Sequence, residues 1–207
     1  VAVYALPDLS ALAVECEAAD GSRAAELYAD RYEGDWQALL TALFSGDIKK
    51  AAHNVKDLMA ALLAQGLPIE GFVFDTALAA YLLDATAGSY DLQRLFVAYY
   101  NEELPRPVHL EPDAFSMLGD RAAAAAALLS YTAAVAALRE TLAPKLRELE
   151  LEPLYYDVEL PLCAVLARME QRGFLIDRAA LAQFGETLQT SITQLEQQIY
   201  AAAGAPF

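Results

Sequence analysis

The hydrophobic pattern of the first third of the chain predicts short strands. Apolar or alternating runs of the kind that form half-buried β-strands cover residues 1–6, 11–18 and 23–32. Pro7-Asp8 and Asp20-Gly21 separate these runs, and both dipeptides favour turns. We therefore expect three strands, of which the second and third form a hairpin.

From residue 35 onward, apolar positions at helical spacing alternate with short apolar runs. Helices are predicted at residues 35–44, 55–65 and 75–83, and strands at residues 48–53 and 72–74. Asn54 and Asp75 each stand where a helix begins, so each is expected to cap free N–H groups there. This alternation predicts an α/β sheet in which at least some strands are parallel.

The second half of the chain is predicted to be mainly helical. Helical spacing of apolar residues covers residues 89–100, 113–149, 159–172 and 178–203. Pro144 is expected to kink or split the second of these helices, because proline lacks an N–H and clashes with the preceding turn. Glu152-Pro153 is the expected domain boundary, and Gly173 is expected to end the third helix.

The last two helices each have an apolar face. In the third helix, apolar side chains at three- and four-residue spacing are Leu162, Val165, Leu166 and Met169. In the last helix, a longer stripe at the same spacing consists of Leu181, Phe184, Leu188, Ile192, Leu195 and Ile199. A stripe of this length predicts a packing partner, either within the chain or in another molecule.

The charge balance limits what the chain can bind. It contains 14 Lys+Arg and 29 Asp+Glu, which gives a formal net charge of −15. Surfaces that grip nucleic acid need clustered cations that release counterions from phosphate. We therefore expect weak or no nucleic-acid binding by these 207 residues alone.

The cysteines and the chain ends bear on compartment and completeness. Cys16 and Cys163 are far apart and belong to no Cys-x-x-Cys or Cys/His cluster, which predicts buried free thiols in a reducing cytosol. No apolar run approaches the roughly 20 residues of a membrane span, so no membrane partner is expected. The chain starts at Val1 without a methionine, and we expect a segment of a longer protein.

Several chemically capable side chains have simpler structural explanations. His53 and His109 lack a Cys or Ser nucleophile in a recognisable setting, and isolated histidines are usually structural. Tyr155-Tyr156 could stack on bases, but no basic residues are interleaved with the pair. Packing in a core or domain interface is the favoured interpretation.

One junction is specific enough to indicate a family. Residues 159–177 have the pattern Glu-x-Pro-Leu-x-x-Val-Leu-x-x-Met-Glu-x-x-Gly-x-x-Ile-Asp. This pattern resembles the junction in bacterial DNA polymerase I, of family A, where the 3′-5′ exonuclease-like domain meets the polymerase thumb. Further segments that are similar to that exonuclease domain and thumb are residues 53–56, 74–76, 80–84, 88–92 and 197–207. The resemblance implies an α/β, ribonuclease H-like 3′-5′ exonuclease fold with a mixed sheet and flanking helices, followed by a helical C-terminal extension.

The same resemblance implies that the metal-binding acids of an active exonuclease are missing. Active members hold two metal ions with four carboxylates, and the metals activate a water and stabilise the leaving oxygen. The strand that matches the first two acids, residues 1–6, contains no carboxylate, and the third position is Leu58. The last motif matches Ala126 and Ser130. We therefore expect no catalytic, cofactor-binding or metal-binding residue in this chain.

Two alternatives remain open. Glu15 and Glu17 would point to one face of a strand, as the Asp-x-Glu of the family does, and with Asp57 they are the candidate residues of an active metal-dependent exonuclease. A solvated face on the second strand of a hairpin predicts the same alternation. Asp57 lies one position before the third acid, about 100° around the helix, where it would stabilise the first turn and point away from the site. The second alternative is a protein-interaction module unrelated to polymerases.

The main hypothesis has two parts. Residues 1–152 are expected to form a degenerate exonuclease-like domain, and residues 153–207 the helical start of a polymerase domain. The resemblance implies a parent DNA-directed DNA polymerase that acts in DNA replication and repair, with Mg²⁺ as its cofactor, DNA as its partner and a cytoplasmic location. The segment itself is expected to hold no cofactor, to be inactive and to support the downstream polymerase domain of the same chain.

Overall fold

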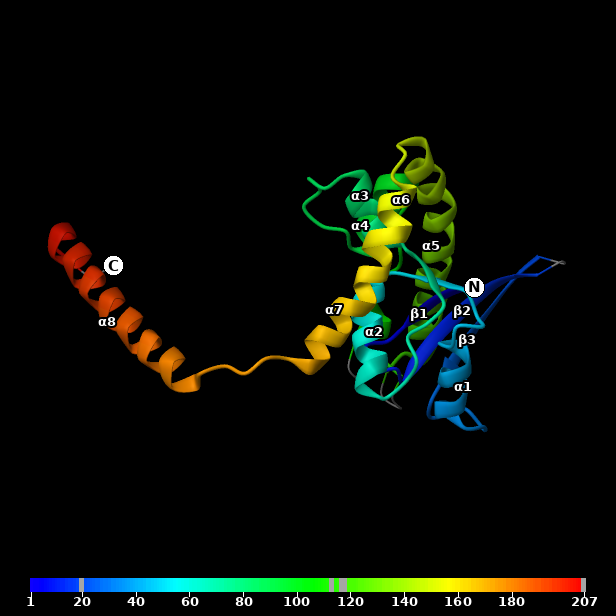
Figure 1. Ribbon diagram of the computed structural model, residues 1–207, viewed down its shortest axis with the longest axis horizontal. Coiled ribbons are helices and arrows are strands. Elements are labelled where there is room, and N and C mark those ends of the chain that lie inside the picture. Colours follow the sequence, from blue (N-terminus) through cyan, green and yellow to red (C-terminus); the bar gives the residue numbers. More distant parts are fainter. Residues whose placement is uncertain (19–20, 112–113, 116–118, 206–207) are drawn as a thin grey trace. The chain divides into compact units, whose positions relative to one another are not determined.

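The computed structural model describes residues 1–18, 21–111, 114–115 and 119–205 (Figure 1). The chain divides into two compact units, residues 1–171 and 172–207. The predicted boundary at Glu152-Pro153 falls inside the first unit. As a border between family domains, that boundary stays a prediction.

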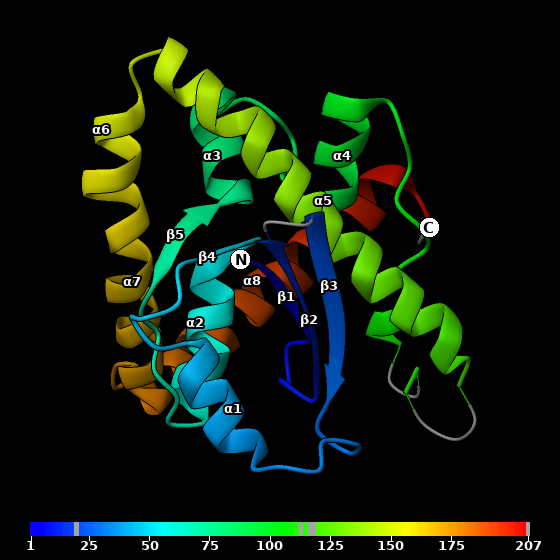
Figure 2. The ribbon, with the colours of Figure 1, turned by 90° about the vertical axis from the view of Figure 1, so that its right-hand side faces the viewer.

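The first unit is built on a mixed sheet. Its described strands are β1 (Ala2–Ala5), β2 (Ala11–Ala18), β3 (Gly21–Tyr28), β4 (Lys50–Ala52) and β5 (Phe72–Asp75). They lie in the order β3-β2-β1-β4-β5 (Figure 2). The β1–β2 and β2–β3 pairs are antiparallel, whereas β4 pairs in parallel with both β1 and β5. The predicted hairpin and the partly parallel sheet are both confirmed, and β1 lies in the middle.

Helices of the first unit follow the predicted order with small shifts at their ends. They are α1 (Trp36–Leu43), α2 (Val55–Ala64), α3 (Thr76–Leu83), α4 (Leu92–Tyr100), the short η1 (Val108–Leu110), α5 (Arg121–Glu148), α6 (Glu152–Leu154), the π-helical η2 (Tyr155–Glu159) and α7 (Leu160–Arg172). Part of the helix predicted from residue 113 lies outside the described residues.

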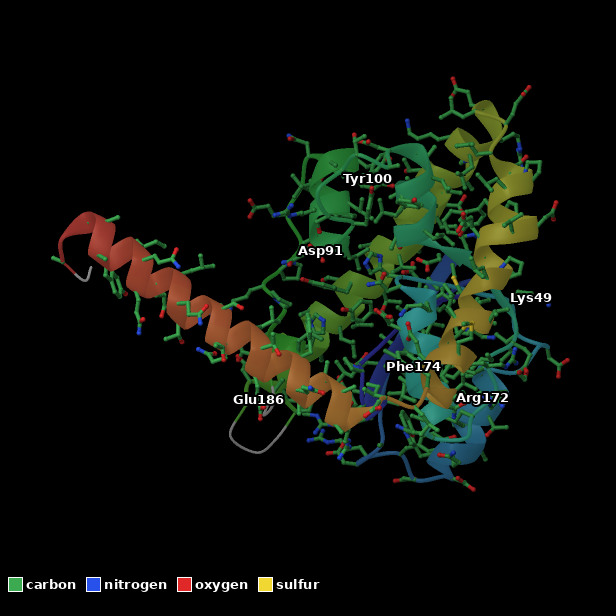
Figure 3. All side chains as sticks on the ribbon, turned by 60° about the vertical axis from the view of Figure 1, so that its left-hand side comes forward. Lys49, Asp91, Tyr100, Arg172, Phe174 and Glu186 are labelled. Atoms are coloured by element: carbon green, nitrogen blue, oxygen red, sulfur yellow. The ribbon has the colours of Figure 1, made fainter. Side chains whose placement is uncertain are left out.

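Side chains that alternate along the strands supply two cores, one on each face of the sheet. Ala2 and Ala51 face a core formed with α3, α4 and α5, whereas Val3 and Ala52 face a core formed with α1, α2 and α7. Tyr100 of α4 (Figure 3) ties the first core to α5, because its hydroxyl donates to the carbonyl oxygen of Ala137 at 2.8 Å. The sheet is therefore a middle layer between two layers of helices.

The long helix α5 differs from two expectations. It continues through Pro144 to Glu148, so of the predicted kink or split at the proline the split is wrong, while the kink stays a prediction. By length and composition alone α5 is also apolar enough to cross a membrane, whereas no membrane span was expected from the sequence. Its buried residues, among them Leu128, Leu138 and Leu142, instead pack in the cores of the first unit. The alanine-rich sequence gives α5 its high hydropathy and its close packing.

We call residues 152–171 the exit segment, which comprises α6, η2 and most of α7. It is helical throughout and precedes Gly173, whose φ of +63° ends α7 as predicted. The side chains that α7 buries are Leu160, Cys163 and Ala167. The predicted apolar face of Leu162, Val165, Leu166 and Met169 is exposed, at 38 to 63%.

The second unit consists mainly of one helix, α8 (Arg178–Ala203). Asp177 caps it as predicted, since its carboxylate accepts from the amides of Ala179 and Ala180, each at 3.0 Å. Gly204, with a φ of +80°, follows its last turn. The predicted stripe of six apolar side chains lies along α8, and all six are exposed.

Candidate functional site

A cavity of about 250 Å³ lies at the carboxyl end of β1, and we call it the β1 cleft. Tyr4 and Leu6 reach it from β1 and the residues that follow, and Leu58 reaches it from the first turns of α2. These positions belong to the strand and the helix in which the resemblance places the first three metal-binding acids. An aromatic and two leucine side chains therefore line the site where carboxylates would be needed.

Tyr4 belongs to an aromatic cluster beside this cleft. Its ring contacts His109 and Tyr131 edge-on, with centroids 5.5 and 5.4 Å away, and the rings of His109 and Tyr131 are 4.5 Å apart. Burial raises the pKa of Tyr4 to about 12, and the nearby Tyr131 adds to the effect. At neutral pH Tyr4 is therefore an uncharged phenol, which is a poor ligand for a hard divalent cation.

His109 is the most unusual member of the cluster. It is 1% exposed, and neither ring nitrogen has a hydrogen-bond partner within the part of the chain that the structure describes. Burial lowers the pKa of His109 to about 4, so the ring is neutral at physiological pH. The structural role predicted for this histidine agrees with its packing. Nothing in the local sequence indicates that it packs against Tyr4, because the contact joins segments that are about 100 residues apart.

The matched positions on α5 do not face Tyr4. Ala126 is exposed, and the hydroxyl of Ser130 donates back to the carbonyl oxygen of Ala126 at 2.8 Å. Tyr131 is the α5 residue whose ring meets Tyr4. Because the alanines repeat, the sequence offers few landmarks for aligning this helix with the family motif. The alignment therefore matched Ala126 and Ser130, which are near Tyr131 in the sequence.

Asp57 lies at the rim of the β1 cleft and also borders a second cavity, between α3 and α7. The expectation that it points away from the cleft is therefore wrong in part. Its side chain is 65% exposed and pairs with Lys56 at 3.0 Å, and Lys56 also binds Glu170 of α7 at 2.8 Å. Asp57 stands in the first turn of α2, where a negative charge favours the helix, as predicted.

Glu15 does not converge with Asp57. Glu15 lies on β2 opposite Ala2 of β1 and lines a different cavity, next to α5. The side chain of Glu17 lies outside the described residues. The strand that carries both acids, β2, is not the middle strand of the sheet. Among the residues that the structure describes, no group of three or more His, Cys, Asp or Glu is placed to hold a metal ion.

Asp75 caps the start of α2, a role that the sequence predicts for Asn54. Asn54 has a left-handed backbone, with a φ of 54°, and its side chain does not cap α2. The carboxylate of Asp75 instead accepts from the amides of Asn54 at 3.1 Å and Val55 at 2.8 Å, while also capping its own helix through Ala77 at 2.9 Å. Burial raises the pKa of Asp75, and these hydrogen bonds oppose that shift.

The remaining predicted residues have structural roles. Nδ1 of His53 lies 2.9 Å from the hydroxyl of Thr76, and burial lowers the pKa of His53 to about 4. Cys16 and Cys163 are free thiols as predicted, although Cys16 is only partly buried. Tyr155 is fully buried in the core, as the packing interpretation expected.

Comparisons with known proteins agree with this architecture. The sequence profile of the family described as DNA polymerase I, ribonuclease H-like domain, matches residues 23–106. DNA polymerase I of Chloroflexus aurantiacus is 36% identical over 167 residues, which cover 76% of this chain and 17% of that protein. DNA polymerase I of Mycobacterium leprae is 32% identical over 201 residues, which cover 95% of this chain and 22% of that protein.

A solved structure is also similar along the whole chain. It is described as the POL domain of Pol1 from M. smegmatis in complex with DNA primer-template and dNTP, and it matches with a TM-score of 0.73 and 26% sequence identity. The match covers 100% of this chain and 34% of that chain. The chain thus spans about a fifth of the length of the curated relatives named above.

Proposed function

Because the chain belongs to the DNA polymerase I family, we propose that it is the structural platform of such a polymerase, an exonuclease-like domain without nuclease activity. The parent protein would extend DNA primers in replication and repair, with DNA as its partner, Mg²⁺ as its cofactor and the cytoplasm as its compartment. Those activities would reside in polymerase segments outside these 207 residues. The M. smegmatis relative, solved with primer-template and dNTP, supports the DNA partner of the parent.

The lining of the β1 cleft is the observation that carries this proposal. Two-metal hydrolysis of a phosphodiester needs carboxylates that hold both ions and so position the attacking water. Tyr4, Leu6 and Leu58 line the cleft instead, and Asp57 at the rim is the one carboxylate among its described lining residues, beside His53 and Asn54. Leucine offers no ligand atom, and a phenol with a pKa of about 12 stays protonated. These residues do not fit a pair of metal ions.

The exposed face of α7 supports a role in contact with the rest of the polymerase. Leu162, Val165, Leu166 and Met169 form one helical face, and contiguous exposed apolar side chains of this kind mark interaction sites. The chain covers only about a fifth of its relatives, so most of the parent protein is available to cover this face. We assign the contact to the downstream polymerase domain.

A nuclease assay tests the loss of catalysis. The 207-residue protein is incubated with a labelled single-stranded oligonucleotide in Mg²⁺ or Mn²⁺, and we expect no shortening above the level of a metal-free control. The Asp57→Ala and Glu17→Ala variants are the matched controls. Degradation by the parent sequence that either substitution abolishes would establish the exonuclease alternative instead.

A further inference from the structure

Asp75 joins four elements of the first unit at one buried point. It is the last residue of β5, and its carboxylate accepts hydrogen bonds from the first amides of both α2 and α3. Its main-chain amide and carbonyl groups bind the exit segment. The hydroxyl of Tyr155 accepts from the Asp75 amide at 2.6 Å and donates to the Asp75 carbonyl oxygen at 3.0 Å.

Tyr155 is the largest fully buried side chain in the described structure. Its ring packs against Phe74 of β5, with centroids 5.3 Å apart. It begins the π-helical turn η2, and π-helical turns are frequently found at functional positions of helices. One hydroxyl thus binds two buried backbone groups, and such groups are costly when they lose a partner.

The rest of the exit segment is held more weakly. Of the α7 side chains, Leu160 is buried in the core formed with α3, α4 and α5. Those packed in the core of α1 and α2 are Cys163, Ala164 and Ala167, which are small and bury little apolar area. Two polar contacts at the surface hold its far end, from Glu170 to Lys56 at 2.8 Å and from Gln171 to the carbonyl oxygen of Leu63 at 2.9 Å. Exposed contacts of this kind contribute little.

From this uneven distribution of contacts we propose that Tyr155 is a positioning residue that latches the exit segment to the sheet through Asp75, so that opening the latch frees residues 152–171 as one unit while the sheet stays folded. Proteins commonly open in such cooperative local units. The inference deepens the proposed platform role, because the exit segment leads into the chain that follows. Its test uses the 207-residue protein alone and is independent of the nuclease assay.

Hydrogen exchange of the Tyr155→Phe variant, read by mass spectrometry, tests the latch. Removing the hydroxyl takes a buried hydrogen-bond partner from both the amide and the carbonyl of Asp75, so we expect exchange in residues 152–171 to accelerate roughly tenfold or more. Exchange in the β2–β3 hairpin should stay within about twofold of the parent rate. Trp36 is the single tryptophan, and its indole donates to the carbonyl oxygen of Leu9 at 3.1 Å, so unchanged emission reports an intact α1.

Two variants serve as controls. Tyr156→Phe removes a hydroxyl from the same π-helical turn, on a side chain that is 39% exposed, and should leave exchange unchanged. Glu170→Gln removes the negative charge from the surface ion pair with Lys56 and should accelerate exchange less than Tyr155→Phe does. The latch is overturned if Tyr155→Phe changes nothing, if it accelerates all segments equally, if Trp36 emission shifts, or if Glu170→Gln has the larger effect.

Discussion

Lys50 is fully buried, although lysine is among the residues that proteins bury least often. Its ammonium donates to the carbonyl oxygens of Ser45 at 3.0 Å and Glu70 at 2.7 Å, and it lies 5.2 Å from the ring centre of Phe72. Gly71 makes room for it, since a Cβ there would lie 2.6 Å from the Lys50 ammonium. Burial lowers the pKa of Lys50 to about 8.

The position of Gly71 predicts a costly substitution. Its φ is +76°, and an added Cβ would meet the carbonyl oxygen of Ser45 at 2.7 Å as well as Lys50. We expect Gly71→Ala to lower the free energy of unfolding by roughly 3 kcal/mol or more, measured by urea denaturation. Gly66→Ala is the matched control, because Gly66 has a φ of +70° but open space around it. It should cost only about 1 kcal/mol, and equal losses would contradict the steric explanation.

His109 predicts a pH dependence of stability. Its pKa is about 4 in the folded protein and near 6.5 when unfolded, so between these values the unfolded chain binds more protons. Stability should therefore fall as the pH drops from 6.5 towards 4, with no contribution from this group above 6.5. His109→Phe should remove about 2 kcal/mol of that loss at pH 5. Urea denaturation at pH 7.5 and pH 5 measures it, and an unchanged acid loss in the variant would refute the assignment.

Asp75 shows how far sequence reasoning reaches for a single residue. An aspartate just before an apolar helix predicts a cap, and Asp75 does cap α3. Its second task, capping α2, depends on β4 and β5 being parallel neighbours, which brings Asn54 and Val55 to its carboxylate. The local sequence does not indicate that contact, and it therefore predicts Asn54 as the cap of α2.

At the scale of elements, α7 shows why a correct helix can bury an unexpected face. Its helical spacing and its end at Gly173 follow from the sequence, but the predicted apolar face of Leu162, Val165, Leu166 and Met169 is exposed. The buried residues are Leu160, Cys163 and Ala167. Periodicity locates an apolar face without showing which partner covers it. Cys163 and Ala167 fit into the core formed with α1 and α2, where larger side chains would need more room, and hydrophobicity alone does not indicate that fit.

This packing predicts losses of stability of different size for substitutions at two neighbouring residues. Ala167 is fully buried, so Ala167→Leu should overpack the core and cost roughly 1–3 kcal/mol of unfolding free energy. Leu166→Ala, on the exposed side, should cost less than about 1 kcal/mol. Thermal denaturation of both variants checks the order. If Leu166→Ala were the more damaging change, the buried face would be wrongly identified.

At the scale of the whole molecule, the mixed strand directions could be anticipated because family resemblance covers nearly the entire chain, whereas the order of the strands was not predicted. The β1 cleft was anticipated through its missing acids, since a leucine or an absent carboxylate is visible in the sequence. Its aromatic cluster was not, because Tyr4, His109 and Tyr131 come from three distant segments. Strand and helix patterns describe elements, whereas the side-chain contacts between elements depend on the assembled fold.

The exposed α7 face predicts a difference between the segment and its parent. Val165→Glu with Met169→Glu should leave the melting temperature of the 207-residue protein within about 2 °C, since both side chains are exposed. In the full-length polymerase the same pair should lower it by several degrees, because charges would enter the proposed contact. Arg172→Glu, at the end of the same helix, is the control. Equal melting temperatures for the altered and unaltered parents would remove α7 from the contact.

The place of β1 at the centre of the sheet has an evolutionary consequence. Its neighbours enclose it on both sides, so Tyr4 and Leu6 add cohesion to the fold where clustered acids would repel one another. Regaining cleavage would require several acids together, and each acid alone would weaken the fold before a bound metal ion could compensate its charge. Under the proposed function, the loss of cleavage would therefore be hard to reverse by selection that acts one substitution at a time.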